Sequence, residues 1–260
     1  MKKSLQSGCI GIIARLGSKR LTDKHLIKIN KQPIITYLIR RIKNHFIKEI
    51  NQHDLRIFIL TGEENINKRL GALTEECGIS IYYGDNKNIP NRMLEVINKY
   101  LFDYIITVDG DDVLCALEGI RKIYDSIHSG NKYVKTINYP FGMNSMGMTK
   151  VFLENSLQGR EKQNLETGWG WIFNENECKN IGHSTKVDER LRFSLDYPED
   201  LSFFKKLIQS ELDILNKNTA EIIDFVIKKK IFLENMHLNN EYWENFRTQK
   251  SSEIKGVING

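Results

Sequence analysis

Short apolar runs and longer amphipathic stretches alternate through the first half of the chain. Four apolar runs have the length of buried strands, and they lie at residues 9–15, 55–61, 79–83 and 104–108. Three stretches between them carry apolar side chains at helical spacing, and these are residues 33–45, 63–77 and 91–101. This alternation of strand and helix predicts an α/β fold with a mostly parallel sheet flanked by helices.

The pattern is less regular in the second half. Helices are predicted at residues 117–128, 151–157, 198–210 and 219–230, and strands at residues 133–137, 169–173 and 190–195. Residues 139–149 hold two glycines and three methionines, which indicates a loop or bulge. No repeat or linker divides the chain, so we expect a single domain over residues 1–250. The polar residues 251–260 predict a flexible tail.

Composition excludes several classes of protein. Hydrophobic residues make up 40% of the 260, but no apolar run reaches the roughly 18–20 residues that a membrane span needs. The first apolar run is also too short for a signal peptide, so we expect a cytoplasmic protein without a membrane partner. The four cysteines are scattered without a CxxC pair, which argues against a zinc site and predicts free thiols.

The net charge of +5 suits an anionic partner, either a small substrate or a nucleic acid. The densest basic run, Lys228–Lys230, lacks interleaved aromatic residues and is typical of a solvated helix end. We therefore expect an anionic small molecule and no nucleic acid.

A basic loop follows the first predicted strand directly. Arg15, Lys19, Arg20 and Lys24 bring four cations within ten residues, together with a glycine and a serine. In an open α/β sheet, ligands bind beyond the carboxyl ends of the strands. The loop therefore lies where a triphosphate would bind, and a solvated basic turn is the alternative interpretation.

Carboxylates follow two other predicted strands. Asp109, Asp111 and Asp112 come at the end of the strand at residues 104–108, and Asp196 ends the strand at residues 190–195. Clustered carboxylates repel one another, and a divalent cation such as Mg²⁺ shared with substrate phosphates relieves the repulsion. Asp111 and Asp196 can hold one such metal. The alternative is a polar turn whose aspartates cap the next helix.

Together these features resemble the cytidylyltransferases that activate acidic sugars, which include the CMP-sialate and CMP-Kdo synthetases and the spore-coat polysaccharide type. The Ala-Arg-x-Gly-Ser-x-Arg-Leu-x-x-Lys pattern of the family is met by Ala14, Arg15, Gly17, Ser18, Arg20, Leu21 and Lys24. Residues 110–112, the Asn91-Arg92 pair and residues 195–201 resemble three further motifs, and residues 139–143 resemble the spore-coat branch. The chain departs from the family at Thr22 and Asp23, where relatives have Pro and Gly, and at Val113, where they have Pro.

This resemblance implies a Rossmann-like fold of the nucleotide-diphosphosugar transferase type and Mg²⁺-dependent transfer of CMP from CTP to an acidic sugar, with release of pyrophosphate. The nucleotide would be bound by Ala14, Arg15, Gly17, Ser18, Lys19, Arg20, Lys24, Arg92 and Asp109. Arg15, Arg20, Lys24 and Asp111 would carry the reaction. Asp111 and Asp196 would hold the metal.

The acceptor sugar and a second copy of the chain would both bind to the irregular region at about residues 139–190. Candidate acceptor-binding residues there are Tyr139, Asn144, Glu166, Trp169 and His183, each of which has a structural role as its alternative. Relatives of this fold commonly pair through the same region, which in this chain is rich in Met and aromatic residues. We therefore expect a homodimer.

Two other functions fit parts of the pattern. A glycosyltransferase of similar fold would use Asp109-Gly110-Asp111 to hold a metal on a finished nucleotide sugar, but its diphosphate needs fewer cations than the basic loop provides. A non-catalytic relative would bind nucleotide only, and it would need fewer of the charged residues that this chain retains.

Overall fold

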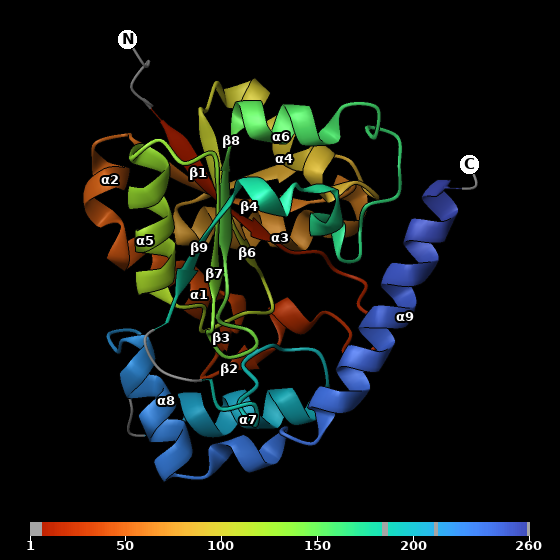
Figure 1. The fold of residues 1–260 in the computed structure, drawn as a ribbon. Helices are drawn as coiled ribbons and strands as arrows, with labels where there is room; N and C mark the ends of the chain where they lie inside the picture. The colour runs from red at the N-terminus through yellow and green to blue at the C-terminus, as the bar shows by residue number, and fades with distance from the viewer. Residues whose placement is uncertain (1–6, 184–186, 211–212, 259–260) are drawn as a thin grey trace.

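The computed structural model describes residues 7–183, 187–210 and 213–258. Within them, seven strands form one mixed sheet in the order β5-β4-β1-β6-β8-β7-β9 (Figure 1). The strands are β1 (Gly8–Ile13), β4 (Leu55–Thr61), β5 (Ser80–Tyr83), β6 (Tyr104–Asp109), β7 (Tyr133–Ile137), β8 (Met146–Thr149) and β9 (Cys178–Gly182). Only β8 runs antiparallel to its neighbours in this sheet, β6 and β7. The single α/β domain with a mostly parallel sheet is therefore confirmed.

Helices cover both faces of the sheet (Figure 1). Their bounds are α1 (Ile35–His45), α2 (Ile47–Asn51), α3 (Glu64–Cys77), α4 (Ile89–Tyr100), α5 (Leu117–His128) and α6 (Lys150–Leu157). Side chains alternate along β1, so that Ile10 and Ile12 pack with α1, α3 and α5, whereas Cys9 packs with α4 and α6. Because helices cover both faces of the sheet, the side chains on both sides of β1 are apolar.

A further apolar cluster lies beyond the end of β6. Val113 and Leu114 pack there against Phe193 and against the helices α7 (Pro198–Ile208) and α8 (Thr219–Lys228). A short hairpin of β2 (Lys28–Ile29) and β3 (Gln32–Pro33) contributes Ile29 to this cluster. The last helix, α9 (Leu238–Ile258), runs along one side of the molecule (Figure 1).

Several predicted elements are wrong in detail. The predicted loop at residues 139–149 ends in the strand β8, and the predicted strand at residues 169–173 is instead the 3-10 helix η2 (Trp169–Ile172). Trp169 and Phe173 both pack into the cluster with α4 and α6, so their spacing reflects a helical turn rather than alternation. The predicted α1 start at Pro33 is also wrong, because Pro33 belongs to the β2–β3 hairpin.

Three further differences concern the end of the chain. Of residues 190–195, Arg192 alone pairs as a strand residue, in an isolated bridge with Phe141, and Arg190 lies in a turn. The strand β9 was not predicted, because it is a polar edge strand with exposed Lys179 and Asn180. The expected tail at residues 251–258 continues α9, and residues 259–260 lie outside the described part of the chain.

All four cysteines are free, as predicted. Within the described part of the chain, no helix has both the length and the apolar character needed to cross a membrane.

Candidate active site

The basic loop and the acidic loop meet at the carboxyl ends of β1 and β6, which are neighbouring parallel strands. Ile13 and Asp109 are partners in the register of these strands, and the Gly110 N–H donates to the Ile13 carbonyl at 2.8 Å. An added Cβ at Gly110 would lie 2.8 Å from the Cβ of Ala14, so only glycine allows this approach. Opposite charges are thereby brought to one edge of the sheet.

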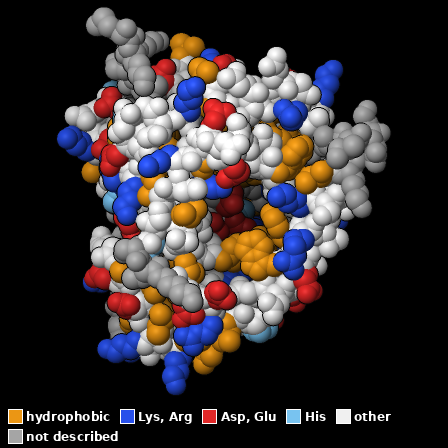
Figure 2. Space-filling view, viewed as in Figure 1, with side chains coloured by type: hydrophobic (Ala, Val, Ile, Leu, Met, Phe, Trp, Pro, Cys, Tyr) orange, Lys and Arg blue, Asp and Glu red, His pale blue; other side chains and the backbone are white. Residues whose placement is uncertain are grey.

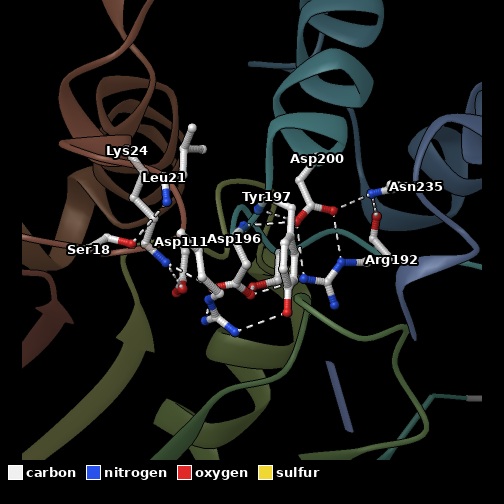
Figure 3. Close-up of polar contacts among 11 residues, drawn as sticks. Ser18, Leu21, Lys24, Asp111, Arg192, Asp196, Tyr197, Asp200 and Asn235 are labelled. Atoms are coloured by element: carbon white, nitrogen blue, oxygen red, sulfur yellow. Dashed lines mark hydrogen bonds and ion pairs between the residues drawn. The ribbon is translucent and has the colours of Figure 1, made fainter. Parts of the chain in front are cut away.

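Lys24 lies between two carboxylates at this edge. Its Nζ is 2.5 Å from Oδ2 of Asp111 and 3.1 Å from Oδ1 of Asp196 (Figure 3). Burial works to lower the pKa of Lys24, but the charges of the two aspartates outweigh it and raise the pKa above its ordinary value. Lys24 therefore stays protonated and links the basic loop to both carboxylates.

The residue before Lys24 explains a departure from the family pattern. Asp23 has a left-handed backbone with φ of 50°, and it precedes the 3-10 helix η1 (Lys24–Leu26). A glycine at this position would adopt this conformation at little cost. Here Asp23 is held by an ion pair with Arg69.

Asp196 is buried and accepts hydrogen bonds from four donors. Arg20 donates to Oδ1 at 2.8 Å alongside Lys24, whereas Arg192 at 3.0 Å and Ser194 at 3.3 Å donate to Oδ2. Three of these donors are cationic, and charge-assisted hydrogen bonds are the strong ones. Asp196 is therefore the point at which the basic loop docks on the segment before α7 (Figure 3).

A second group of polar side chains, centred on Asp200, holds the residues that contact Asp196. Asp200 forms a paired ion bridge with Arg192 and also accepts from the backbone N–H groups of Asp196 and Tyr197, each at 2.9 Å. Asn235 donates to the same carboxylate at 2.8 Å. Sequence reasoning assigned Asp200 only to the helix start and missed Arg192. An arginine inside the apolar run at residues 191–195 was the available signal.

The acidic loop carries unequal charges. Burial alone would raise the pKa of Asp111, but the positive charge of Lys24 outweighs it and lowers the pKa below its ordinary value. The Asp109 side chain reaches solvent in a hollow. The protein around it removes part of its hydration, and this effect, followed by the negative charge of Asp111, raises its pKa to about 7. Burial is the main effect that raises the pKa of Asp112 well above the usual range, and the negative charge of Asp111 is the second. These shifts favour protonation of Asp109 and Asp112 over that of Asp111, so the negative charge of the loop is concentrated on Asp111.

Three cations of the basic loop, Arg15, Lys19 and Arg20, have exposed side chains. Arg15 pairs with Glu166 at 2.5 Å, and Arg20 lies over the ring of Tyr197, 5.0 Å from its centroid. Lys19 is exposed and forms no ion pair among the described residues. Gly17 turns the loop at φ of +90°, and Ser18 accepts from the backbone N–H of Leu21 at 3.4 Å. The loop thus holds Arg15, Lys19 and Arg20 available to an anion.

Arg92 has a structural role. It is buried and donates to the Asp85 carbonyl at 2.8 Å and 2.6 Å and to the Leu60 carbonyl at 3.4 Å. Burial lowers its pKa to about 10. These bonds fix the turn after β5.

A pocket opens beside the acidic loop. Figure 2 shows a hollow with acidic side chains on its floor and apolar side chains on its rim. A cavity of about 430 Å³ is lined by Asp109, Trp169, Trp171 and two side chains of α9, Phe246 and Lys250, among others. Of the candidate acceptor residues, Trp169 therefore lines a pocket, and Glu166 lies close by in its pair with Arg15.

The other three candidate acceptor residues do not line this pocket. Tyr139 is buried against the ring of His183, with their centroids 4.9 Å apart. Asn144 donates to the carbonyls of Tyr139 and Pro140, each at 3.3 Å, and so fixes a turn. These contacts give each of the three a structural role, and acceptor binding by them stays a prediction.

The side chains that motivated a homodimer are used within the chain. Met143, Met148 and Trp169 are buried, and Phe141 packs against α9. The homodimer stays a prediction, and it no longer has support from these residues.

The chain is similar to known proteins over most of its length. Residues 10–237 match a family model described as cytidylyltransferase. An uncharacterised protein of Methanocaldococcus jannaschii is 29% identical over 229 residues, which is 84% of this chain and 90% of that protein.

Two solved structures share the fold. One is a cytidylyltransferase from Leptospira borgpetersenii, with a TM-score of 0.75 and 19% identity, covering 89% of this chain and 98% of that one. The other is a CMP:2-keto-3-deoxy-manno-octonic acid synthetase complexed with CTP, with a TM-score of 0.56 and 15% identity, covering 79% of this chain and 100% of that one. At these identities the likeness concerns the fold.

Proposed function

The chain belongs to the cytidylyltransferase family, and we propose that it transfers CMP from CTP to an acidic sugar with release of pyrophosphate. The acceptor in this proposal is a 2-keto-3-deoxy sugar acid, such as a nonulosonate or a Kdo-like acid, for surface polysaccharide or glycan synthesis. Support comes from the fold shared with a CMP:2-keto-3-deoxy-manno-octonic acid synthetase, whose structure holds CTP.

The observation that carries the proposal is the position of Lys24 between Asp111 and Asp196, with Arg20 beside it. Cations and carboxylates that satisfy one another in this way can exchange partners when a charged substrate arrives. The phosphates of CTP would accept from Arg20 and Lys24, while Arg15 and Lys19 offer further positive charge on the exposed loop. A triphosphate makes use of all four cations.

The donor set also fits Mg²⁺. Asp111 and Asp196 direct oxygens at one point, the Nζ of Lys24, which shows that a single cation can contact both. No three His, Cys, Asp or Glu side chains converge as a metal site in the described ranges, so the protein would supply about two ligands. Mg²⁺ commonly takes one or two carboxylates and completes its shell with substrate phosphates and water. Bound there, it would neutralise charge on the triphosphate.

The reaction then depends on position and charge. A hydroxyl of the sugar attacks the α-phosphorus of CTP, a P–O bond to the sugar forms, and the bond to the β-phosphate breaks to release pyrophosphate. Arg20 and Lys24 would hold the leaving phosphates and stabilise the charge that develops on them. The neighbouring pocket at Asp109 would hold the acceptor in line with this bond.

A screen of pyrophosphate release tests the proposal. Purified protein would be assayed with CTP, UTP, ATP or GTP and with a panel of acidic and neutral sugars in the presence of Mg²⁺. We expect release only when CTP and an acidic sugar are both present. Equal release with any nucleotide, or release with neutral sugars alone, would contradict the proposed acceptor class or base preference.

A further inference from the structure

The last helix, α9, lies outside the part of the chain that matches the family. The match ends at residue 237, and α9 spans Leu238–Ile258. In Figure 1 this helix stands apart from the layers that cover the sheet and runs past the segment that holds η2. It nevertheless contacts the candidate active site at two places.

The first contact is at the buried charge cluster. The ring of Tyr242 lies under two guanidinium groups, 4.7 Å from Arg192 and 5.6 Å from Arg20. The same ring packs against Phe141 with centroids 4.7 Å apart. These contacts fix the beginning of α9 beside the residues that hold Asp196.

The second contact is at the pocket. Phe246 and Lys250, one turn apart on α9, line the pocket together with Trp169 and Trp171. Asp109 also lines the cavity, so the pocket is continuous with the acidic loop. A helix beyond the family match therefore builds part of a pocket of about 430 Å³ beside the site.

Two features hold α9 in this position. The Glu253 carboxylate accepts from the backbone N–H of Thr167 at 3.0 Å and 2.8 Å. The helix also packs closely on Gly168, where an added Cβ would lie 3.0 Å from Cδ of Lys250 and 3.1 Å from Cζ of Phe246. The stem of Lys250 is thus fixed along the pocket wall.

The two cations of the pocket are not equivalent. Lys135 forms an ion pair with Glu175, so its charge is already balanced. Lys250 has no such partner among residues 7–183, 187–210 and 213–254. The ammonium of Lys250 is therefore available to an anionic group of a ligand.

The sheet order assigns the pocket to the acceptor side. The basic loop follows β1, whereas the pocket lies over β6, β8 and β7, through Asp109, Met146 and Tyr133. A triphosphate on the basic loop and a molecule in the pocket would thus lie on opposite sides of Asp109. The space beside the phosphates is where an attacking hydroxyl must come from.

We infer that α9 supplies the acceptor specificity of this enzyme: Lys250 binds the carboxylate of the sugar acid, and Phe246 packs against its carbon skeleton together with Trp169 and Trp171. This inference rests on the proposed function. It assigns recognition of the acidic group to a helix that the family match does not include.

The test compares Lys250→Gln and Phe246→Ala with Arg247→Gln, an exposed residue on the same helix that does not line the pocket. The probes are the acidic sugar that the wild-type enzyme turns over fastest and its methyl ester, which lacks the charge. We expect Lys250→Gln to raise KM for the acid about 10-fold or more and to remove the preference for acid over ester. KM for CTP should stay within about twofold, since CTP binds elsewhere.

Phe246→Ala should raise KM for acid and ester alike, and Arg247→Gln should change neither. Thermal unfolding of each variant checks that the fold is kept. Unchanged acceptor kinetics in Lys250→Gln, or an acid preference that survives it, would overturn the inference while leaving the proposed function intact. If the wild-type enzyme uses no acidic sugar, the proposed function fails and the inference fails with it.

Discussion

Arg192 and Asp200 form a fully buried ion pair behind the site, with Nε of the arginine 2.8 Å from Oδ1 of the aspartate. Nη2 of Arg192 extends this pair to Asp196 at 3.0 Å. The chain thus places a structural carboxylate behind the carboxylate that faces the basic loop. Removing Arg192 leaves Asp200 as an uncompensated buried charge, and removing Asp200 leaves Arg192 with Asp196 alone as its carboxylate partner among the described residues.

Asp200→Ala should therefore destabilise the protein by about 3–5 kcal/mol. The variant removes the partner of Arg192 and the acceptor for two backbone N–H groups at the start of α7. Urea unfolding at pH 7 measures the effect, with Glu199→Ala as the control, since Glu199 is exposed at the same helix start and should change stability by less than about 0.5 kcal/mol. Equal effects of the two substitutions would mean that the buried pair adds nothing.

Asp111→Asn should nearly abolish CTP turnover, because it removes one of the two carboxylates that converge on a single cation position. Excess EDTA should stop the wild-type reaction, and added Mg²⁺ should restore it. The assay is pyrophosphate release at saturating CTP and acceptor. Full activity of the wild-type enzyme in EDTA would show that the carboxylates serve only to hold Lys24.

Arg20→Ala and Lys24→Ala should each weaken CTP binding or turnover by about 1–3 kcal/mol, the scale of charge-assisted hydrogen bonds. Lys68→Ala, which removes an exposed cation on α3, is the matched control and should have no effect. Calorimetric titration with CTP measures the loss of binding free energy, and kcat/KM measures the effect on turnover. If all three variants behave like the wild type, the basic loop is a solvated turn.

The buried His25 predicts a dependence of stability on pH. Burial, followed by the charge of Lys24, lowers its pKa to about 4, whereas an unfolded histidine titrates near pH 6.5. Because the unfolded state binds the proton first, stability should fall as the pH drops from about 6.5 to about 4, by roughly 2–3 kcal/mol. Urea unfolding at pH 7 and pH 4.5 measures this loss. His25→Leu should show a smaller loss than the wild type, and an identical loss would exclude His25 as its source.

The bounds of several elements could be predicted from the local hydrophobic pattern of the sequence. The strands β4 and β7 and the helix α5 have the predicted bounds, because each is an unbroken apolar or amphipathic segment. Asp196 follows a segment that lies outside the sheet, so the order of the strands does not explain its contact with Lys24. The meeting of Lys24 with Asp111, in contrast, follows from a cation and a carboxylate placed after the neighbouring parallel strands β1 and β6. Contacts of this kind are predictable because parallel strands end at one edge of the sheet.

Contacts between distant segments were not predictable. Trp169 and Phe246 line one pocket although 77 positions separate them, and no local pattern joins an irregular turn to the last helix. The antiparallel strand β8 is likewise inserted between β6 and β7 by tertiary packing. Only one residue of this pocket, Trp169, was among the candidates chosen from the sequence.

The most direct test of the central claim is phosphorus NMR of the reaction of CTP with an acidic sugar, catalysed by the wild-type enzyme in Mg²⁺. We predict that the resonances of CTP decline as those of pyrophosphate and of a single new phosphodiester, the CMP-sugar, appear in equal amounts. Formation of free CMP without the phosphodiester, or unchanged CTP with every acidic sugar, would contradict the assignment of this chain as an acidic-sugar cytidylyltransferase.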